Sequence, residues 1–494
     1  MENENNGLGI KISKKTVMGV TAILLFIMIF AGILTQVIPS GSYAVDEAGS
    51  IINGTYQQID KSEVGYSFWR VFISPIETFI YDTSSALTGL IIILVITFIG
   101  GTFLILSKSG VMKYMMCVLV NKFEKKKYLL LAALILGCML LSSFAGVLEE
   151  SITLVPFAIA ISLSFGWDSF VGLSMSLLSV TFGYAAATFN PFNVGLVQSM
   201  AGLPMFSGVA FRVLVFIVIY AILAIFFITY AKKIEKNPEK SLCYESDFEL
   251  KERYAVEADS KYILENKALS KGAGAFGKAL LSVLIITIIC LVANIFIENS
   301  TISDIIGYMP LVSMTILFTV GGIRGGLLSG MTKKELKSTF MEGIKTVLPV
   351  APMIILIICV TYILKRGMII DTMLYYVYDI LKGQNAYVSI VFIFFVICIF
   401  EFFIGSGTAK AFLLMPILLP LVEMVGIGKQ NLIVAFCVSD GFCNVLFPTN
   451  GLLMIALGML GISYFKYIRI TWKLFLAEFI AAIGMMLLAQ YIGY

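Results

Sequence analysis

Long apolar segments separated by short polar ones run through the whole chain. A helix of about 20 apolar residues can cross the ~30 Å hydrocarbon core of a bilayer, and segments of this length recur from residue 17 to residue 491. They lie at residues 17–38, 88–107, 128–165, 167–204, 208–231, 278–297, 304–323, 347–364, 386–424, 428–461 and 467–491. The pattern predicts an all-α polytopic membrane protein with the lipid bilayer around it.

Composition supports a membrane environment and excludes several functions. The chain is 59% hydrophobic and 13% charged, whereas soluble domains carry about 25% charged residues. The formal net charge of +4 gives no indication of a nucleic-acid partner. There is no histidine, and the eight cysteines form no Cys-X-X-Cys pair, which argues against a zinc or haem site. We therefore expect no cofactor.

Two of the apolar segments contain a polar break in the middle. Ser142-Ser143-Phe144-Ala145-Gly146 interrupts residues 128–165, and Gly405-Ser406-Gly407-Thr408 interrupts residues 386–424. Broken helices leave backbone groups unpaired, and this is tolerated in a membrane only where protein or a water-filled cavity surrounds them. We predict that each segment is a re-entrant hairpin and that the next segment, 167–204 or 428–461, is a broken helix.

The two hairpins belong to an internal repeat. Pro156 after the first break matches Pro416 after the second, and Gly202-Leu203-Pro204 matches Gly461-Ile462-Ser463 at nearly the same offset. The alternative is that Gly and Pro only kink ordinary helices. Lysine-rich loops, which favour the cytoplasm, orient the two copies oppositely. The sequence therefore predicts two inverted repeats, a common construction of secondary transporters.

This interpretation divides the chain and orients it. We expect an N-terminal helix with an extracytoplasmic loop (1–87), repeat one (88–231), a cytoplasmic loop (232–277), scaffold helices (278–346) and repeat two (347–494). The protein is predicted to be multi-pass in the inner or plasma membrane, with its N-terminus in the cytoplasm and its C-terminus outside.

The breaks are where a small substrate would bind. Free N–H groups at a half-helix N-terminus attract a carboxylate, and unwound carbonyls and side-chain amides suit a cation. A sodium ion near Asn190 and Asn450, or a proton, would serve as the coupling ion. The candidate substrate-binding residues are Ser143, Gly146, Glu149, Glu150, Thr188, Asn190, Asn193, Gly405, Ser406, Gly407, Thr408, Lys410, Asp440, Asn444, Thr449 and Asn450.

Charged side chains inside a membrane are costly and are normally paired or functional. Glu150 and Lys410 stand at equivalent positions before the two matched prolines, so we predict that they form a pair, either structural or in contact with substrate. Glu149 and Asp440 then have no evident basic partner. Glu401 is expected near the outer end of the second hairpin, in reach of water.

Several segments resemble one transporter family. They are residues 405–416 (GSGTAKAFLLMP), 440–451 (DGFCNVLFPTNG), 189–204 (FNPFNVGLVQSMAGLP) and 38–43 (IPSGSY). They are similar to the YfcC group of the DcuC-type anaerobic dicarboxylate carriers, in the ion transporter superfamily. The resemblance implies a homodimer with a scaffold and a transport part that moves as an elevator. Neither tip has the Ser-Asn-Thr motif of the related INDY-like carriers, so the resemblance alone does not imply sodium binding or dicarboxylate specificity.

These observations predict a secondary active transporter, either an exchanger or a symporter. Glu149, Glu150 and Asp440 outnumber Lys410 in the central segments, which favours a basic amino acid such as arginine or ornithine. The resemblance also implies members similar to arginine/ornithine antiporters. A four-carbon dicarboxylate carrier is the alternative. The sequence has no nucleophile–base spacing, which argues against an intramembrane enzyme. It has no repeated pore motif, which argues against a channel.

Overall fold

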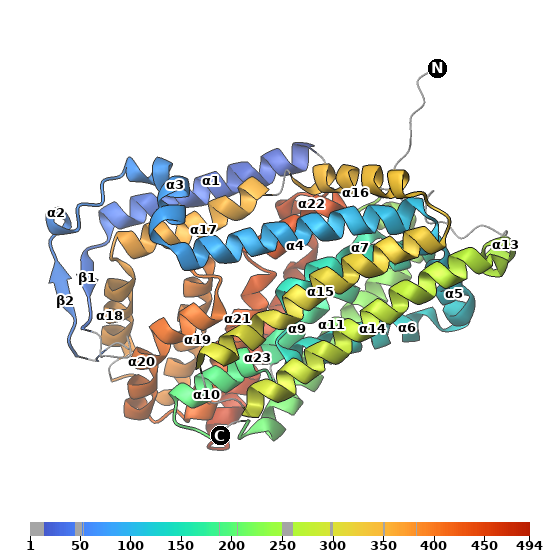
Figure 1. Ribbon diagram of the computed structural model, residues 1–494. Coiled ribbons are helices and arrows are strands. Elements are labelled where there is room, and N and C mark those ends of the chain that lie inside the picture. The colour runs from blue at the N-terminus through green and yellow to red at the C-terminus, as the bar shows by residue number, and fades with distance from the viewer. Residues whose placement is uncertain are drawn as a thin grey trace.

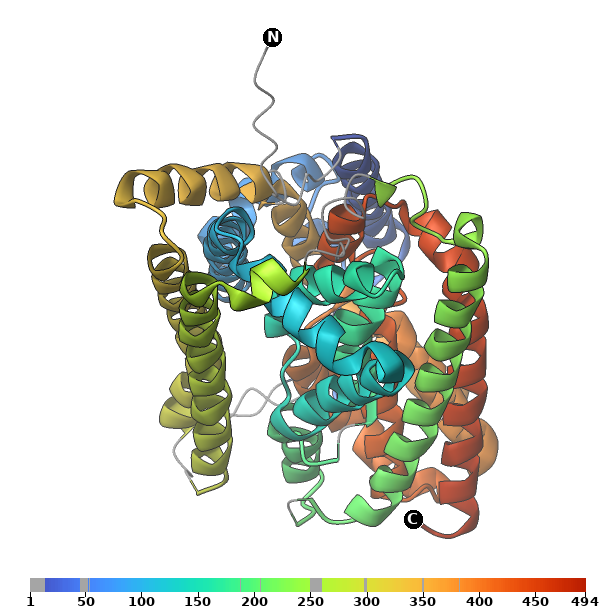
Figure 2. The ribbon, with the colours of Figure 1, turned by 90° about the vertical axis from the view of Figure 1, so that its right-hand side faces the viewer.

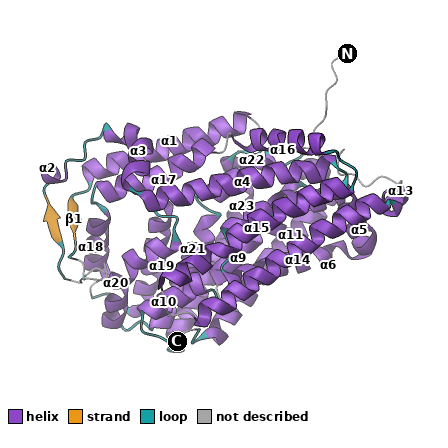
Figure 3. Cartoon of the chain, in the orientation of Figure 1, coloured by secondary structure: helices purple, strands orange, loops and turns teal. Residues whose placement is uncertain are grey.

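The computed structural model describes residues 14–44, 52, 54–186, 188–204, 206–248, 260–296, 300–348, 351–381 and 383–494. Almost all of this part of the chain is helical, and one small hairpin of two antiparallel strands lies at its edge (Figure 3). The strands are β1 (Ser40–Ser42) and β2 (Gln57–Ile59), paired with Gly41 opposite Gln58.

The helices of the first half of the chain are α1 (Lys14–Val37), α2 (Lys61–Val64), α3 (Arg70–Tyr81), α4 (Thr83–Lys108), α5 (Val111–Phe123), η1 (Glu124–Lys126), α6 (Lys127–Ala145), η2 (Glu149–Thr153), α7 (Val155–Ser164), α8 (Ser169–Leu173), η3 (Ser174–Leu178), α9 (Ser179–Ala186), η4 (Pro191–Gly195), α10 (Leu196–Met200), α11 (Val209–Lys236) and η5 (Pro238–Lys240). Those of the second half are α13 (Ser260–Glu265), α14 (Lys267–Phe296), α15 (Ser300–Leu328), α16 (Lys333–Val347), α17 (Ala351–Arg366), α18 (Ile370–Leu381), α19 (Ala386–Phe403), α20 (Gly407–Val425), α21 (Lys429–Asn444), α22 (Gly451–Leu460) and α23 (Tyr464–Tyr491).

The prediction of an all-α polytopic membrane protein is confirmed. Eight helices of the described residues are long and apolar enough to cross a membrane. The amphipathic α16 is different, because a capping box of Thr332 and Glu335 starts it and it carries several lysines. It lies at the edge of the bundle, close to the N-terminal end of the described chain (Figure 1).

The first polar break separates α6 from η2 and α7. Gly146 ends α6 in the left-handed conformation, with φ of 68°, which glycine adopts without steric cost. The helix that follows, α8–η3–α9, stops at Ala186, and the chain resumes as η4 and α10. A hairpin with a non-helical tip is therefore followed by an interrupted helix.

The same succession recurs in the second half. Helix α19 ends at Phe403, three non-helical residues follow, and Ser406 caps α20 by accepting a hydrogen bond from the Ala409 N–H. Helix α21 then stops at Asn444, and α22 begins after the Asn450 cap. The order of elements agrees with the internal repeat, while the opposite orientation of the two copies and the division into units stay predictions.

The two interrupted helices, α9 and α21, approach each other closely. A Cβ atom placed on Gly441 of α21 would lie 2.4 Å from the Cα of Ala185 in α9. One placed on Gly183 of α9 would lie 2.3 Å from the Met139 carbonyl oxygen of α6. Glycine at these positions lets the backbones touch, as small residues do in membrane helix packing.

Long helices flank this centre on two sides. The antiparallel pair α14 and α15 forms one side, and α11 with α23 forms another (Figure 2). The first pair also meets at glycines, because a Cβ on Gly272 would lie 2.7 Å from the Gly325 carbonyl oxygen.

Candidate functional site

A buried cluster of three charged side chains lies at the tip of the second hairpin. Lys410, in the first turn of α20, pairs with Glu401 near the end of α19 and with Asp440 of α21. Its Nζ lies 2.6 Å from Asp440 Oδ1. The exposed fractions of Lys410, Glu401 and Asp440 are 0%, 3% and 0%. Two carboxylates thus share one ammonium group, which leaves the cluster with an excess of negative charge.

Asp440 connects the two halves of the molecule. Its second oxygen, Oδ2, accepts a hydrogen bond of 3.2 Å from Asn193 Nδ2 in η4. The same oxygen lies 2.6 Å from where a Cβ would stand on Gly407, so the absent side chain lets the hairpin tip approach the carboxylate. Asn444 Nδ2 donates to the Asp440 carbonyl oxygen at 2.7 Å, and Asn450 Nδ2 donates to Asn444 Oδ1 at 2.5 Å.

Glu149, at the tip of the first hairpin, faces this cluster. Its side chain is exposed to solvent. It lies close enough to Asp440 for the two charges to interact. Tyr184 of α9 lies near both acids and hydrogen-bonds to Asn190. A third carboxylate is therefore available beside the pair shared by Lys410.

Hydroxyl groups and one arginine organise the break of the first half. Ser143 Oγ and Thr188 Oγ1 are 3.1 Å apart, and the Thr188 N–H donates to Ser143 Oγ at 3.0 Å. The Thr188 carbonyl accepts a 3.3 Å hydrogen bond from Arg212 Nη2 of α11. Arg212 is only 1% exposed, and its other hydrogen bonds go to Ser207, Gln430 and Tyr494.

In the second half, tyrosine hydroxyls bind the carbonyl groups at the break. The Tyr467 hydroxyl donates to the Val445 carbonyl and the Tyr464 hydroxyl to the Leu446 carbonyl, each at 2.7 Å. Both carbonyls are left free where α21 stops, so the hydroxyls satisfy groups that lipid could not. Asn450 caps the next half-helix, α22, by accepting from the Leu453 N–H at 3.1 Å.

Comparison with known proteins agrees with this architecture. The family model for DcuC, the C4-dicarboxylate anaerobic carriers, matches residues 19–491. The chain belongs to the DcuC family. It is 26% identical over 417 residues to YfcC of Escherichia coli (strain K12), which is provisionally named a basic amino acid antiporter; the match covers 82% of this chain and 79% of YfcC. It is also 25% identical over 418 residues to an uncharacterized protein of Haemophilus influenzae, over 85% of this chain and 77% of that protein.

Two solved structures have some likeness to the chain. One is Neisseria gonorrhoeae MtrF, described with a class of antimetabolite efflux pumps, at 16% identity and a TM-score of 0.43, covering 96% of this chain and 94% of MtrF. The other is the YdaH transporter of Alcanivorax borkumensis, at 13% identity and a TM-score of 0.45, covering 96% of this chain and 99% of YdaH.

Two expectations about charge in this DcuC-family chain are wrong. Asp440 has a basic partner, Lys410. Glu401 is buried at the hairpin tip instead of reaching water, because α19 ends at Phe403 and the break follows directly. The Glu150 side chain lies outside what the structure describes, so its pairing with Lys410 stays a prediction.

The other candidates fall into two groups. Asn193 and Gly407 touch Asp440, and Asn444 and Asn450 continue from it along the second break. Three candidates are exposed on the second tip: Gly405, Ser406 and Thr408. Two are half-buried in the non-helical stretches, Gly146 and Thr449. Ser143 is hydrogen-bonded to Thr188.

The predicted sodium ion remains untested. Asn190 Oδ1 accepts from the Asn193 N–H at 3.3 Å, and Asn450 Oδ1 caps α22. Among the described residues, no group of three or more Cys, Asp or Glu side chains is arranged to hold a metal ion.

Arg212 is the functional candidate that the sequence reasoning missed. A buried arginine four residues after Gly208, at the start of an apolar helix, is a visible signal in the sequence, because such a charge requires partners. The structure supplies those partners at the first break.

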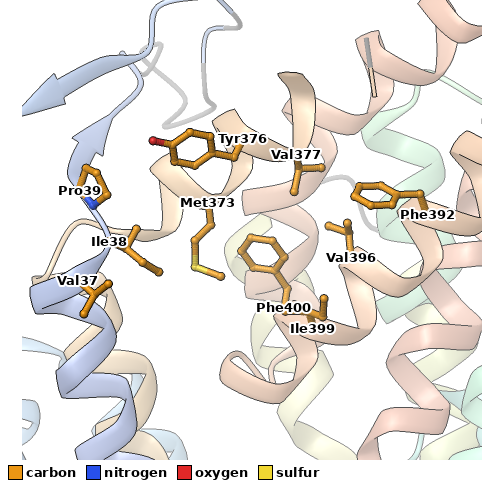
Figure 4. Close-up of a pocket in the computed structure, with 10 residues that line it drawn as sticks. All are labelled: Val37, Ile38, Pro39, Met373, Tyr376, Val377, Phe392, Val396, Ile399 and Phe400. Atoms are coloured by element: carbon orange, nitrogen blue, oxygen red, sulfur yellow. The ribbon is translucent and has the colours of Figure 1, made fainter. Parts of the chain in front are cut away.

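A separate pocket of about 490 Å³ lies between the end of α1, α18 and the outer face of α19 (Figure 4). Ile38, Met373, Val396 and Phe400 are among its lining residues, and no charged side chain is among them. Because it offers no charged partner, the pocket does not suit a polar substrate, and the charged cluster remains the candidate site.

Proposed function

We propose that this DcuC-family transporter is a secondary active carrier of basic amino acids such as arginine and ornithine. The observation that carries the proposal is the charge at the tips, where Glu401 and Asp440 pair with a single lysine and Glu149 lies near Asp440. The acids still outnumber the bases when Arg212 is counted. A surplus of buried negative charge favours a cationic ligand, which supplies the missing positive charge.

Each end of the substrate has a suitable partner. Asp440 is the proposed ligand of the cationic side chain, because it faces both hairpin tips and both halves. The N-terminus of α20, where Ser406 and Thr408 are exposed, suits the α-carboxylate, since N–H groups at a helix N-terminus attract anions. The name of the YfcC relative supports the same substrate class.

A four-carbon dicarboxylate is the second candidate, because the family model carries that description. Lys410 and the N-terminus of α20 would then hold the two carboxylates. Against this, Lys410 is already paired with two acids. An intramembrane enzyme or a channel has less support, since the named relatives of the family are carriers and antiporters.

The working arrangement is part of the proposal. We infer a homodimer in the cell membrane with the N-terminus in the cytoplasm, two inverted repeats with hairpins at 128–165 and 386–424, and a transport unit that moves against the scaffold. Exchange or symport, and sodium or a proton as coupling ion, are the modes to be distinguished.

Counterflow in proteoliposomes tests the substrate. Vesicles preloaded with unlabelled arginine are expected to accumulate labelled arginine and ornithine, while succinate and malate neither enter nor compete. Asp440→Asn should abolish the uptake, and Asp379→Asn, at an exposed aspartate of α18, should leave it unchanged. Counterflow driven by succinate with arginine inert would replace this proposal by the dicarboxylate carrier.

A further inference from the structure

We propose that Lys410 holds the place of the substrate's cationic group in the empty carrier and yields Asp440 to it on binding, keeping Glu401. This inference rests on the proposed function and names the residue that competes with the substrate. In the structure Lys410 has the contacts that an incoming ammonium or guanidinium group would need: two carboxylates, and the Phe436 ring with its centroid 5.5 Å from Nζ.

The two ion pairs of Lys410 have different positions in the fold. Glu401 and Lys410 belong to the same hairpin, one at the end of α19 and one in the first turn of α20. Asp440 belongs to α21, outside the hairpin. The first pair is therefore internal to the tip, and the second joins the tip to the interrupted helix. Only the Lys410–Asp440 pair has to open when a ligand enters between the hairpin tip and α21.

Charge balance favours a bound state in which Lys410 keeps Glu401 and the substrate takes Asp440. The empty cluster of two carboxylates and one ammonium carries a net charge of −1 when all three groups are ionised. A second cation brings the buried cluster to neutrality, with Lys410 on Glu401 and the substrate on Asp440. If the substrate expelled Lys410 from the tip, Glu401 would be left buried without a partner, which is strongly unfavourable. We therefore expect Lys410 to stay at the tip, paired with Glu401.

The local structure around Asp440 is compatible with this exchange. Gly407 places no side chain against Asp440, and the neighbouring tip residues Gly405, Ser406 and Thr408 are exposed. Asn193 holds Asp440 from the other side at 3.2 Å, so the carboxylate stays in place when its lysine partner leaves. The flexible lysine stem lets the ammonium turn toward Glu401 while α20 keeps its position.

A competitor inside the protein lowers the apparent affinity for the substrate, because only molecules with Asp440 released can bind it. Removing the competitor should therefore tighten binding. A lysine that bound the substrate directly would give the opposite result.

Arginine binding to the purified full-length protein, measured by calorimetry in detergent, tests the inference. Lys410→Met is expected to lower the dissociation constant for arginine at least about fivefold. Citrulline, in which a neutral urea replaces the guanidinium group, should gain little, so the ratio of the two affinities should rise. The matched control is Lys429→Met, which removes a half-exposed lysine at the start of α21 whose partner, Glu423, lies at the far end of α20.

Should Lys410→Met fail to fold because Glu401 is left unpaired, Glu401→Gln with Lys410→Met removes both charges of the tip and carries the same expectation. If wild-type protein binds arginine and the lysine variants bind it more weakly, the inference is overturned and the proposed function stands. Wild-type protein that binds succinate but neither arginine nor ornithine overturns both.

Discussion

The two hairpin regions share an order of elements but differ in chemistry. At the second tip, charge dominates: Lys410 joins Glu401 to Asp440 in a fully buried cluster. At the first tip, the described contacts are between neutral groups, Ser143 with Thr188, and Glu149 faces the cluster of the other half. Repetition of the fold has therefore not produced a symmetric site. The second half supplies most of the charge, and the first supplies amides and hydroxyls that position it.

At the breaks in the interrupted helices, the charged side chain belongs to the first half and the neutral ones to the second. The free carbonyl at Thr188 in the first half is held by the charged Arg212, whereas those at Val445 and Leu446 in the second are held by tyrosine hydroxyls. The first half thus has neutral contacts at its tip and a charged side chain at its break, and the second half has the opposite arrangement. Substitutions can show whether the charged side chains in each half serve transport or stability.

Moving the central carboxylate between the halves should have the largest effect. Asp440→Asn is expected to lower arginine counterflow at least about 100-fold, because it removes the charge and leaves Lys410 with one partner. Adding Asn193→Asp restores a carboxylate from the first half, whose side-chain amide lies 3.2 Å from Asp440. The double variant should recover part of the activity. Equal activity of wild type and Asp440→Asn would show that Asp440 does not bind the substrate.

Arg212 and Tyr467 compare how the two breaks are stabilised. Arg212→Met should lower the free energy of unfolding by about 3 kcal/mol, because the Thr188 carbonyl and other buried acceptors lose a charged donor. Tyr467→Phe removes one neutral donor and should cost about 1–2 kcal/mol. Thermal unfolding of the purified protein measures both, with Arg366→Met at an exposed arginine as control. A larger loss for Tyr467→Phe would mean that the arginine is not the main support of the first break.

Two glycines of the second tip separate contact with Asp440 from general flexibility. A Cβ on Gly407 would lie 2.6 Å from Asp440 Oδ2, whereas one on Gly405 would have its nearest neighbour at 4.0 Å. Gly407→Ala should therefore lower counterflow about 10-fold by displacing the carboxylate or the tip, a cost of about 1.4 kcal/mol. Gly405→Ala should remain close to wild type. Equal loss in both variants would indicate that tip flexibility, not the close approach, matters.

The smallest effect is expected from the two serines of the tips. Ser143→Ala leaves the buried Thr188 N–H without its acceptor and should lower the free energy of unfolding by about 1–2 kcal/mol. Ser406→Ala removes an exposed helix cap and should cost about 1 kcal/mol or less. Thermal unfolding measures the difference, and Thr408→Ala at an exposed position is the control. A greater loss in Ser406→Ala would reverse the assigned roles of the two tips.

The sequence indicated the fold because lipid imposes strict rules on it. Long apolar runs can only be helices there, and polar Gly/Ser groups within such runs, as at Ser143 and Gly407, can only lie where protein shelters them. These rules locate the breaks along the chain. They do not state which side chains meet in space.

The pairing at the site needed the structure for that reason. The predicted pairing of Lys410 with Glu150 rests on their equivalent positions in the repeat and stays a prediction, because equivalence under a repeat does not state which side chains touch. The described partners are Glu401, in the same hairpin, and Asp440, in the next helix. The expectation that Glu401 reaches water places it near the outer end of the second hairpin, whereas α19 ends at Phe403 and Glu401 lies buried at the tip.

The close crossing of α9 and α21 limits how this molecule can change shape. At Gly441 the backbone of one interrupted helix rests on that of the other, with no space even for a methyl group. Sliding one past the other would force atoms together, so we expect the two helices to move together. Whatever movement exposes the substrate to the opposite compartment has to occur around this joint, at surfaces where side chains, not main chains, are in contact.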